Sequence, residues 1–120
     1  MSFALRAFPA QKPAVNAANV TILNNEETPD VWTEYDASAV VGARTVKCIF
    51  EITTGQNYSF GVRPNGSTAN FSNGMAAANV TGNSAGTAMI ECLSDSAGKI
   101  QYKGHITISG TTLKLIGFIV

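Results

Sequence analysis

The stretch RTVKCIFEI, residues 44–52, decides the fold because its apolar residues recur at every second position. Successive side chains of an extended chain point to opposite faces, so a period of two indicates a β-strand. One face of this strand carries four apolar side chains: Val46, Cys48, Phe50 and Ile52. The other face carries Lys47, Ile49 and Glu51. We therefore predict a strand that is buried on one face and partly covered on the other.

Similar short runs follow along the chain, separated by clusters of Gly, Ser, Asn and Asp. They are NYSFGVR (57–63), TAMIECL (87–93), KIQYK (99–103), HITIS (105–109) and TTLKLIGFIV (111–120), the last apolar on both faces. Short strands spaced about 8 to 12 residues apart are typical of an all-β sandwich or barrel. We predict an antiparallel, jelly-roll-like β-sandwich and leave an immunoglobulin-like strand order open. The Ala-rich stretch MAAANV, residues 75–80, is long enough for one helical turn only.

The first thirty residues differ from the rest, because they show two early prolines and no sustained period. They hold one strand-like piece, residues 19–23. We predict an extended N-terminal arm over residues 1–30 and a β-sandwich domain over residues 31–120. Apolar side chains near a chain end need a surface to pack on. We expect the arm to contact a neighbouring chain through Phe3, Leu5, Arg6 and Phe8.

Eight basic residues balance eight acidic ones, so the formal net charge is zero. Binding to nucleic acid or to an anionic membrane requires a basic excess, and we therefore expect neither partner. A surface with so little charge favours association with other copies or other proteins. The opening MSFALRAFPAQKP does not follow the pattern of a secretory signal, and no apolar run reaches the about 18 residues that cross a membrane. We expect synthesis in a cytoplasm.

The sequence offers no recognisable active site, and we expect neither an enzyme nor a bound cofactor or metal. The two cysteines, Cys48 and Cys92, lie within apolar strand patterns and have no CxxC spacing. We interpret them as buried thiols, although a disulfide between neighbouring strands is geometrically possible. The single histidine, His105, lies on a predicted strand with no nucleophile or acid beside it.

The turn in NYSFGVRPNGSTANFSNG, residues 57–74, is the most prominent loop signal. Pro64 suits the first central position of a β-turn, and Asn65 and Gly66 tolerate positive φ. Arg63 then stands at the rim, free to pair with an acid of its own chain or of a neighbour. We interpret Arg63, Pro64, Asn65 and Gly66 as an interface or surface turn. Aromatic and amide side chains in and near this loop leave open a glycan-binding face.

A family resemblance emerges from the order of four segments: YDASAVVGA before a strand, then FGVRPNGST, ECLSDSAGKIQYKG and a closing TTLKLIGFIV. This order resembles the small β-sandwich proteins of tailed-bacteriophage virions, which include capsid decoration (cement) proteins and fibre-head domains. The resemblance covers roughly residues 31–120. It implies a homotrimer and a place on the virion, at the capsid surface, after synthesis in the bacterial host.

Within that family, the resemblance implies two roles. Only about thirty residues precede the sandwich, without the heptads or repeats of a fibre shaft. We therefore expect a capsid decoration subunit that binds the major capsid protein and stabilises the assembled shell. The alternative is a tail-fibre or receptor-binding head, whose loop at residues 63–73 would contact a host-surface glycan.

Overall fold

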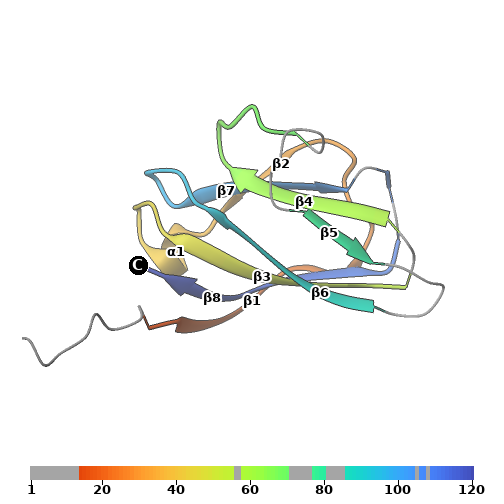
Figure 1. Cartoon of the computed structure of the whole chain (residues 1–120), viewed down its shortest axis with the longest axis horizontal. Helices are drawn as coiled ribbons and strands as arrows, with labels where there is room; N and C mark the ends of the chain where they lie inside the picture. Colours follow the sequence, from red (N-terminus) through yellow and green to blue (C-terminus); the bar gives the residue numbers. More distant parts are fainter. Residues whose placement is uncertain (1–13, 56–57, 71–76, 81–85, 105, 108) are drawn as a thin grey trace, which may run out of the picture.

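A computed structural model describes residues 14–55, 58–70, 77–80, 86–104, 106–107 and 109–120. Within these ranges the chain forms eight strands and one short helix (Figure 1). In chain order they are β1 (Asn16–Glu26), β2 (Thr33–Asp36), α1 (Ser38–Val41), β3 (Lys47–Thr54), β4 (Tyr58–Pro64), β5 (Ala77–Val80), β6 (Gly86–Leu93), β7 (Lys99–Gly104) and β8 (Thr111–Ile119).

The strands form two antiparallel sheets packed face to face, visible as two layers in Figure 1. Sheet A has the order β1-β8-β3-β6, and sheet B has the order β2-β7-β4-β5. The first four strands pair with the last four in reverse order: β1 with β8, β2 with β7, β3 with β6 and β4 with β5. This nested pairing is the jelly roll of two Greek keys. The predicted all-β, jelly-roll-like sandwich is therefore confirmed.

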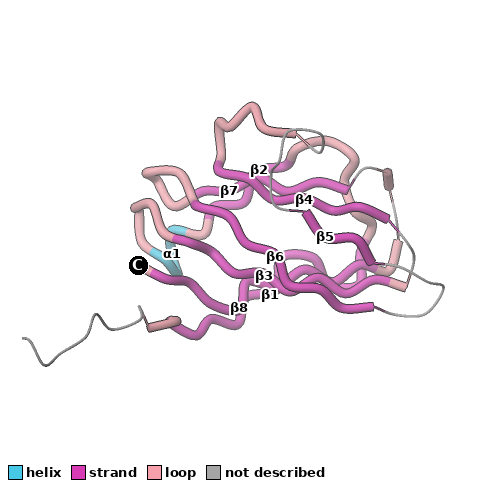
Figure 2. The backbone as a smooth tube through the Cα atoms, in the orientation of Figure 1, coloured by secondary structure: helices cyan, strands magenta, loops and turns pink. Residues whose placement is uncertain are grey.

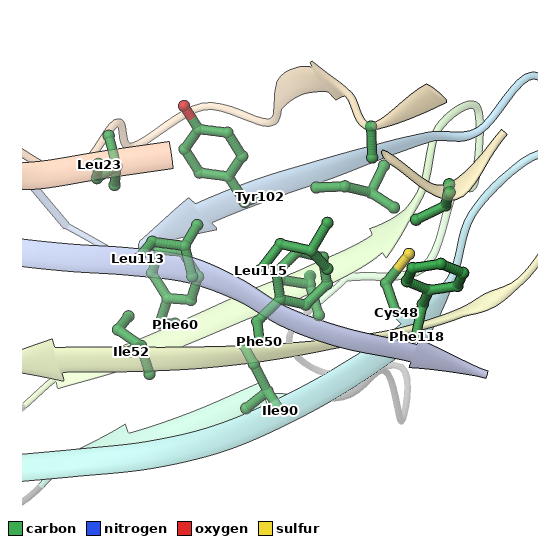
Figure 3. Packing of buried hydrophobic residues seen from close by; sticks show 14 of the residues in the cluster. Leu23, Cys48, Phe50, Ile52, Phe60, Ile90, Tyr102, Leu113, Leu115 and Phe118 are labelled. Carbon is green, nitrogen blue, oxygen red and sulfur yellow. The ribbon is translucent and has the colours of Figure 1, made fainter. Parts of the chain in front are cut away.

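β3 alternates as its sequence predicts. Cys48, Phe50 and Ile52 are fully buried between the sheets, whereas Lys47 is exposed. Their neighbours in sheet A face the same core, since Phe50 pairs with Ile90 of β6 and with Leu115 of β8. Figure 3 shows these side chains gathered between the two layers. A side chain the size of Phe50 in such a core contributes about 3–5 kcal/mol relative to alanine.

Sheet B closes the core from the other side with Phe60 of β4 and Tyr102 of β7. Their rings stack with centroids 6.2 Å apart and planes inclined by 24°. Such a pair adds about 0.5–1.5 kcal/mol beyond the apolar area that it buries. The two aromatic residues therefore belong to the hydrophobic core (Figure 3).

The predicted boundary between arm and sandwich is corrected by β1. This strand begins at Asn16 and pairs with β8 over its length, so the sandwich starts well before residue 31. β1 is an edge strand on which only Leu23 is buried, and its pairing shifts register in three places. Ala18, Val20 and Ile22 alternate on its core side but are only partly buried, so the period is weak and the sequence pattern reveals only residues 19–23. Residues 1–13 lie outside the described part.

The expectations for helical turns also need correction. Ala77–Val80 is a strand that pairs with β4, because four residues cannot sustain a helix against the pairing offered by a neighbouring strand. The described helical turn is α1 instead (Figure 2), which begins where Asp36 Oδ1 accepts a 2.9 Å hydrogen bond from the Ser38 backbone N–H. In the described part of the chain, no helix is long and apolar enough to cross a membrane.

Candidate functional site

The predicted contact residues of the arm, Phe3, Leu5, Arg6 and Phe8, lie outside the described residues. The same holds for His105 and for the last three residues, 71–73, of the loop at residues 63–73. The described part of that loop runs from Arg63 to Asn70.

The predicted turn is present, one residue further along the chain than the sequence suggests. The Ser67 backbone N–H donates a 3.1 Å hydrogen bond to the Pro64 carbonyl, so Asn65 and Gly66 occupy the central positions. Gly66 has φ +84°, as a type II turn requires at its second central residue. Pro64 instead remains the last residue of β4, opposite Ile100 of β7. Its pairing with β7 delays the turn by one residue.

Arg63 is not free at the rim, which corrects the expectation for this residue. Its guanidinium lies over the Trp32 indole, with Cζ 4.0 Å from the ring centroid. Its Nε donates a 2.6 Å hydrogen bond to Gln101 Oε1, and a terminal nitrogen donates to the Ala69 carbonyl. Partial burial lowers the pKa of Arg63, which still carries its charge at neutral pH. Arg63 therefore fixes the loop against sheet B.

Trp32 lies close to a second cation, because Lys103 Nζ of β7 is 5.7 Å from its ring centroid. Cations over an indole are each stabilised by about 0.5–1 kcal/mol at exposed sites. A sugar that stacked on this ring would compete with Arg63 for the indole. The geometry therefore favours a structural role for Trp32 and Arg63 together.

Asn65 joins the loop to the turn between β6 and β7. Its Nδ2 donates a 3.3 Å hydrogen bond to Asp95 Oδ2. Asp95 Oδ1 accepts hydrogen bonds from the backbone N–H groups of Lys99 at 2.8 Å and Ala97 at 2.9 Å. These bonds, led by the one from Lys99, hold the pKa of the Asp95 carboxyl below its usual value. The turn residues are thus tied into the fold.

A different surface stands out on the outer face of sheet A. Four apolar side chains lie across its end, and we call them the terminal apolar strip: Leu93, Ile49, Ile119 and Val15. Leu93 of β6 is 51% exposed and Val15, just before β1, is 59% exposed. Single exposed leucines and valines are common on protein surfaces, but these side chains lie together at one end of a single sheet.

The register of sheet A assembles this strip. Lys47 of β3 lies between Leu93 and Ile119, its partners on β6 and β8. Ile49 is paired with Gly117, and a Cβ on Gly117 would lie 2.9 Å from Val15 Cγ1. The strip therefore reaches from one edge of the sheet to the other. One sequence feature points to this strip, because residues 111–120 are apolar on both faces.

Charges beside the strip are matched within the chain. Lys47 Nζ lies 3.0 Å from Glu91 Oε1, and Glu51 of β3 lies opposite Lys114 of β8. Opposite charges on facing strand positions attract one another modestly. The outer face of sheet A thus presents apolar area with little unbalanced charge.

The described ranges contain no pocket and no group of three or more His, Cys, Asp or Glu side chains placed to hold a metal. Comparisons with protein-family models, with curated proteins and with solved structures find no match to this chain. The terminal apolar strip is therefore the candidate functional surface.

Proposed function

We propose that this protein is a structural virion subunit of a tailed bacteriophage, a capsid decoration or cement protein. It binds the assembled shell as a homotrimer and stabilises it through contacts with the major capsid protein. The trimer and the viral setting come from the sequence resemblance. The fold is compatible with this role, because eight-stranded jelly rolls recur in viral capsid proteins, although they also occur in lectins and enzymes.

The observation that carries the proposal is the terminal apolar strip. It lies on the outer face of a four-stranded sheet, and its charged neighbours are already paired. Such a face suits a protein–protein interface, whose centre is apolar and depleted in unpaired charge. Val15 belongs to this strip and lies two residues after residue 13 in sequence. The strip would then form the contacts between copies of this chain, whereas the arm residues Phe3, Leu5 and Phe8 would contact the capsid.

The stabilising mechanism is mass action. A protein that binds the assembled shell but not the separate capsid subunits shifts the equilibrium toward the shell. At a free concentration 100 times the dissociation constant, each site adds about 2.7 kcal/mol. Many weak sites on one particle therefore suffice, and no chemical reaction is needed.

The first test is the number of copies per particle. Purified virions are separated on a denaturing gel, and this chain is quantified against the major capsid protein. A ratio close to that of the capsid protein supports decoration. A few copies per particle contradicts it and favours the fibre-head alternative, in which the loop at residues 63–73 contacts a host glycan.

A pair of variants on β6 tests the strip itself. Leu93→Glu places a carboxylate in the strip, and Thr87→Glu places one at an exposed position toward the other end of the same strand. Burying a carboxylate in an apolar interface is costly even opposite Lys47, so we expect Leu93→Glu to weaken self-association at least about tenfold, whereas Thr87→Glu leaves it unchanged. Light scattering over a dilution series measures both. Equal behaviour of the two variants would exclude the strip from the trimer interface.

A truncation separates arm from strip. Deleting residues 1–30 would remove β1 and damage sheet A, so the deletion must end at residue 13. We expect the shortened chain to form the trimer but to lose attachment to purified particles that lack this protein. Normal attachment would contradict the role of Phe3, Leu5, Arg6 and Phe8.

A further inference from the structure

The two cysteines lie directly opposite each other on neighbouring strands. Cys48 of β3 pairs with Cys92 of β6 in an unbroken antiparallel register. The Ser94 backbone N–H donates a 2.9 Å hydrogen bond to the Val46 carbonyl, two residues away on each strand. Because hydrogen-bonded and non-hydrogen-bonded pairs alternate along an antiparallel ladder, Cys48 and Cys92 form a hydrogen-bonded pair.

Both thiols also lie on the same face of sheet A. Cys48 is fully buried, next to Phe118 of β8 (Figure 3), and Cys92 packs against the same core while remaining partly exposed. Burial raises the pKa of the Cys48 thiol to about 11. Burial also raises the pKa of Cys92, and negative charge at Cys48 and at Glu91 raises it further. The influence of one thiol on the other reflects their proximity.

The backbone spacing is compatible with a covalent bond. Cα atoms of a hydrogen-bonded pair are about 5.5 Å apart, inside the about 4.4–6.8 Å range of disulfides. Cβ atoms of facing residues are about 4.5–5.5 Å apart, at or beyond the upper limit of about 4.5 Å for a disulfide. The strands must therefore move slightly closer together. Among the described strands, β6 has a sheet neighbour on one side only, so no second strand has to move with it.

We propose that Cys48 and Cys92 are a covalent modification site, a dithiol that closes into a cross-strand disulfide in an oxidising medium and fastens the edge strand β6 to β3. This inference does not depend on the proposed virion role. The bond would be strained, and strained disulfides are reduced more easily than ordinary structural ones. The disulfide would thus link β3 and β6 reversibly.

The reaction with a small disulfide, such as glutathione disulfide, takes place in two exchanges. Cys92, the more exposed thiol, loses its proton to solvent, and its thiolate attacks one glutathione sulfur and releases one glutathione thiolate. Cys48 then loses its proton and attacks the Cys92 sulfur of the mixed disulfide, which releases the second glutathione. Two protein thiols are oxidised, and one glutathione disulfide is reduced to two thiols. Because burial keeps both thiols protonated at neutral pH, the exchange is slow.

The test counts thiols in the native chain. The reduced protein is incubated with increasing glutathione disulfide, quenched with acid, denatured, treated with N-ethylmaleimide and weighed by intact mass spectrometry. We expect the labelled product to change from two maleimide adducts per chain to none. The unlabelled product should weigh two hydrogens less than the reduced, unlabelled chain. Treatment with dithiothreitol before labelling should restore both adducts. The variant Cys92→Ser should retain one thiol as an adduct or a glutathione conjugate and form no internal bond.

Several results would overturn the proposal. These are two adducts at every oxidant concentration, a bond that forms only in denaturant, or a bond that only links separate chains on a non-reducing gel.

A second measurement does not require a variant. The oxidised chain should unfold at a higher urea concentration than the reduced chain, because the bond restricts the unfolded state. An equal or lower midpoint would argue against a fastening role.

Discussion

Gly98, in the turn between β6 and β7, has no room for a side chain. Its φ is +80°, and a Cβ there would lie 2.3 Å from the Gly42 carbonyl oxygen and 3.1 Å from Ser38 Cα. Both contacts are backbone atoms that cannot rotate away. The Gly98 carbonyl also accepts a 2.9 Å hydrogen bond from the Ala37 backbone N–H, so a displaced turn would disturb the start of α1. Gly98→Ala therefore combines an unfavourable backbone conformation with a collision.

Gly66 provides the matched control, because it has almost the same backbone angle without the collision. Its φ is +84°, and a Cβ there would have no atom within 4 Å. Gly66→Ala thus measures the conformational cost alone, about 1–2 kcal/mol. Forcing a methyl group into a filled space costs about 1–3 kcal/mol more. We expect Gly98→Ala to lower the free energy of unfolding by about 2–5 kcal/mol.

Urea unfolding followed by Trp32 fluorescence and by circular dichroism measures both variants. With a slope of about 2 kcal/mol per molar urea, the midpoint should fall by about 0.5–1 M for Gly66→Ala and by about 1–2.5 M for Gly98→Ala. The slopes should remain equal, since both variants unfold from the same fold. Equal midpoints for the two variants would refute the steric argument and mean that the turn moves freely away from Gly42.

Two further predictions concern buried and acidic side chains. Ser94→Ala should lower the free energy of unfolding by about 1–3 kcal/mol, because Ser94 Oγ accepts the 2.9 Å hydrogen bond of the buried Val46 backbone N–H. Urea unfolding measures this, and an unchanged midpoint would contradict it. Asp95 has a lowered pKa in the folded state, so its contribution is present above its unfolded pKa and lost as the pH falls through the folded one. Asp95→Asn should therefore flatten the loss of stability below about pH 4, measured as urea midpoints against pH, and a slope equal to that of the unmodified chain would argue against it.

The sequence predicts the strands that line the core, because burial on one face imposes a period of two. The alternation in residues 44–52 becomes β3, with Phe50 and Ile52 fully buried. Exposed strands are harder to predict, because little burial means a weak period of two. β1 lies at an edge with one fully buried residue, Leu23, and its other core-side residues are only partly covered, so the period of two is weak there. The predicted arm therefore extended too far into the sandwich.

The candidate surfaces depend on register, which a single sequence does not determine. Leu93 and Ile119 are far apart in the chain, and only their shared neighbour Lys47 brings them onto one face. The facing positions of Cys48 and Cys92 depend on the same register. Arg63 was expected at a rim because its nearest sequence neighbours form a turn, whereas its partners Trp32 and Gln101 come from distant segments. Local patterns contain no information on such contacts.

The order of strands in sheet A has a consequence for synthesis on the ribosome. β8 is the last of the described strands in chain order and lies between β1 and β3, so β1 has no neighbour among the described strands of its sheet until residues 111–119 have left the ribosome. At about 5–20 residues per second, the interval from Glu26 to Thr111 lasts about 4–17 s. During this interval β3 can pair with β6 on one side only, and the edge that pairs with β8 remains accessible to solvent and to other nascent chains. Sheet A is therefore completed only once residues 111–119 have emerged, and the yield of this protein in cells should depend on what protects that edge of β3 during the interval.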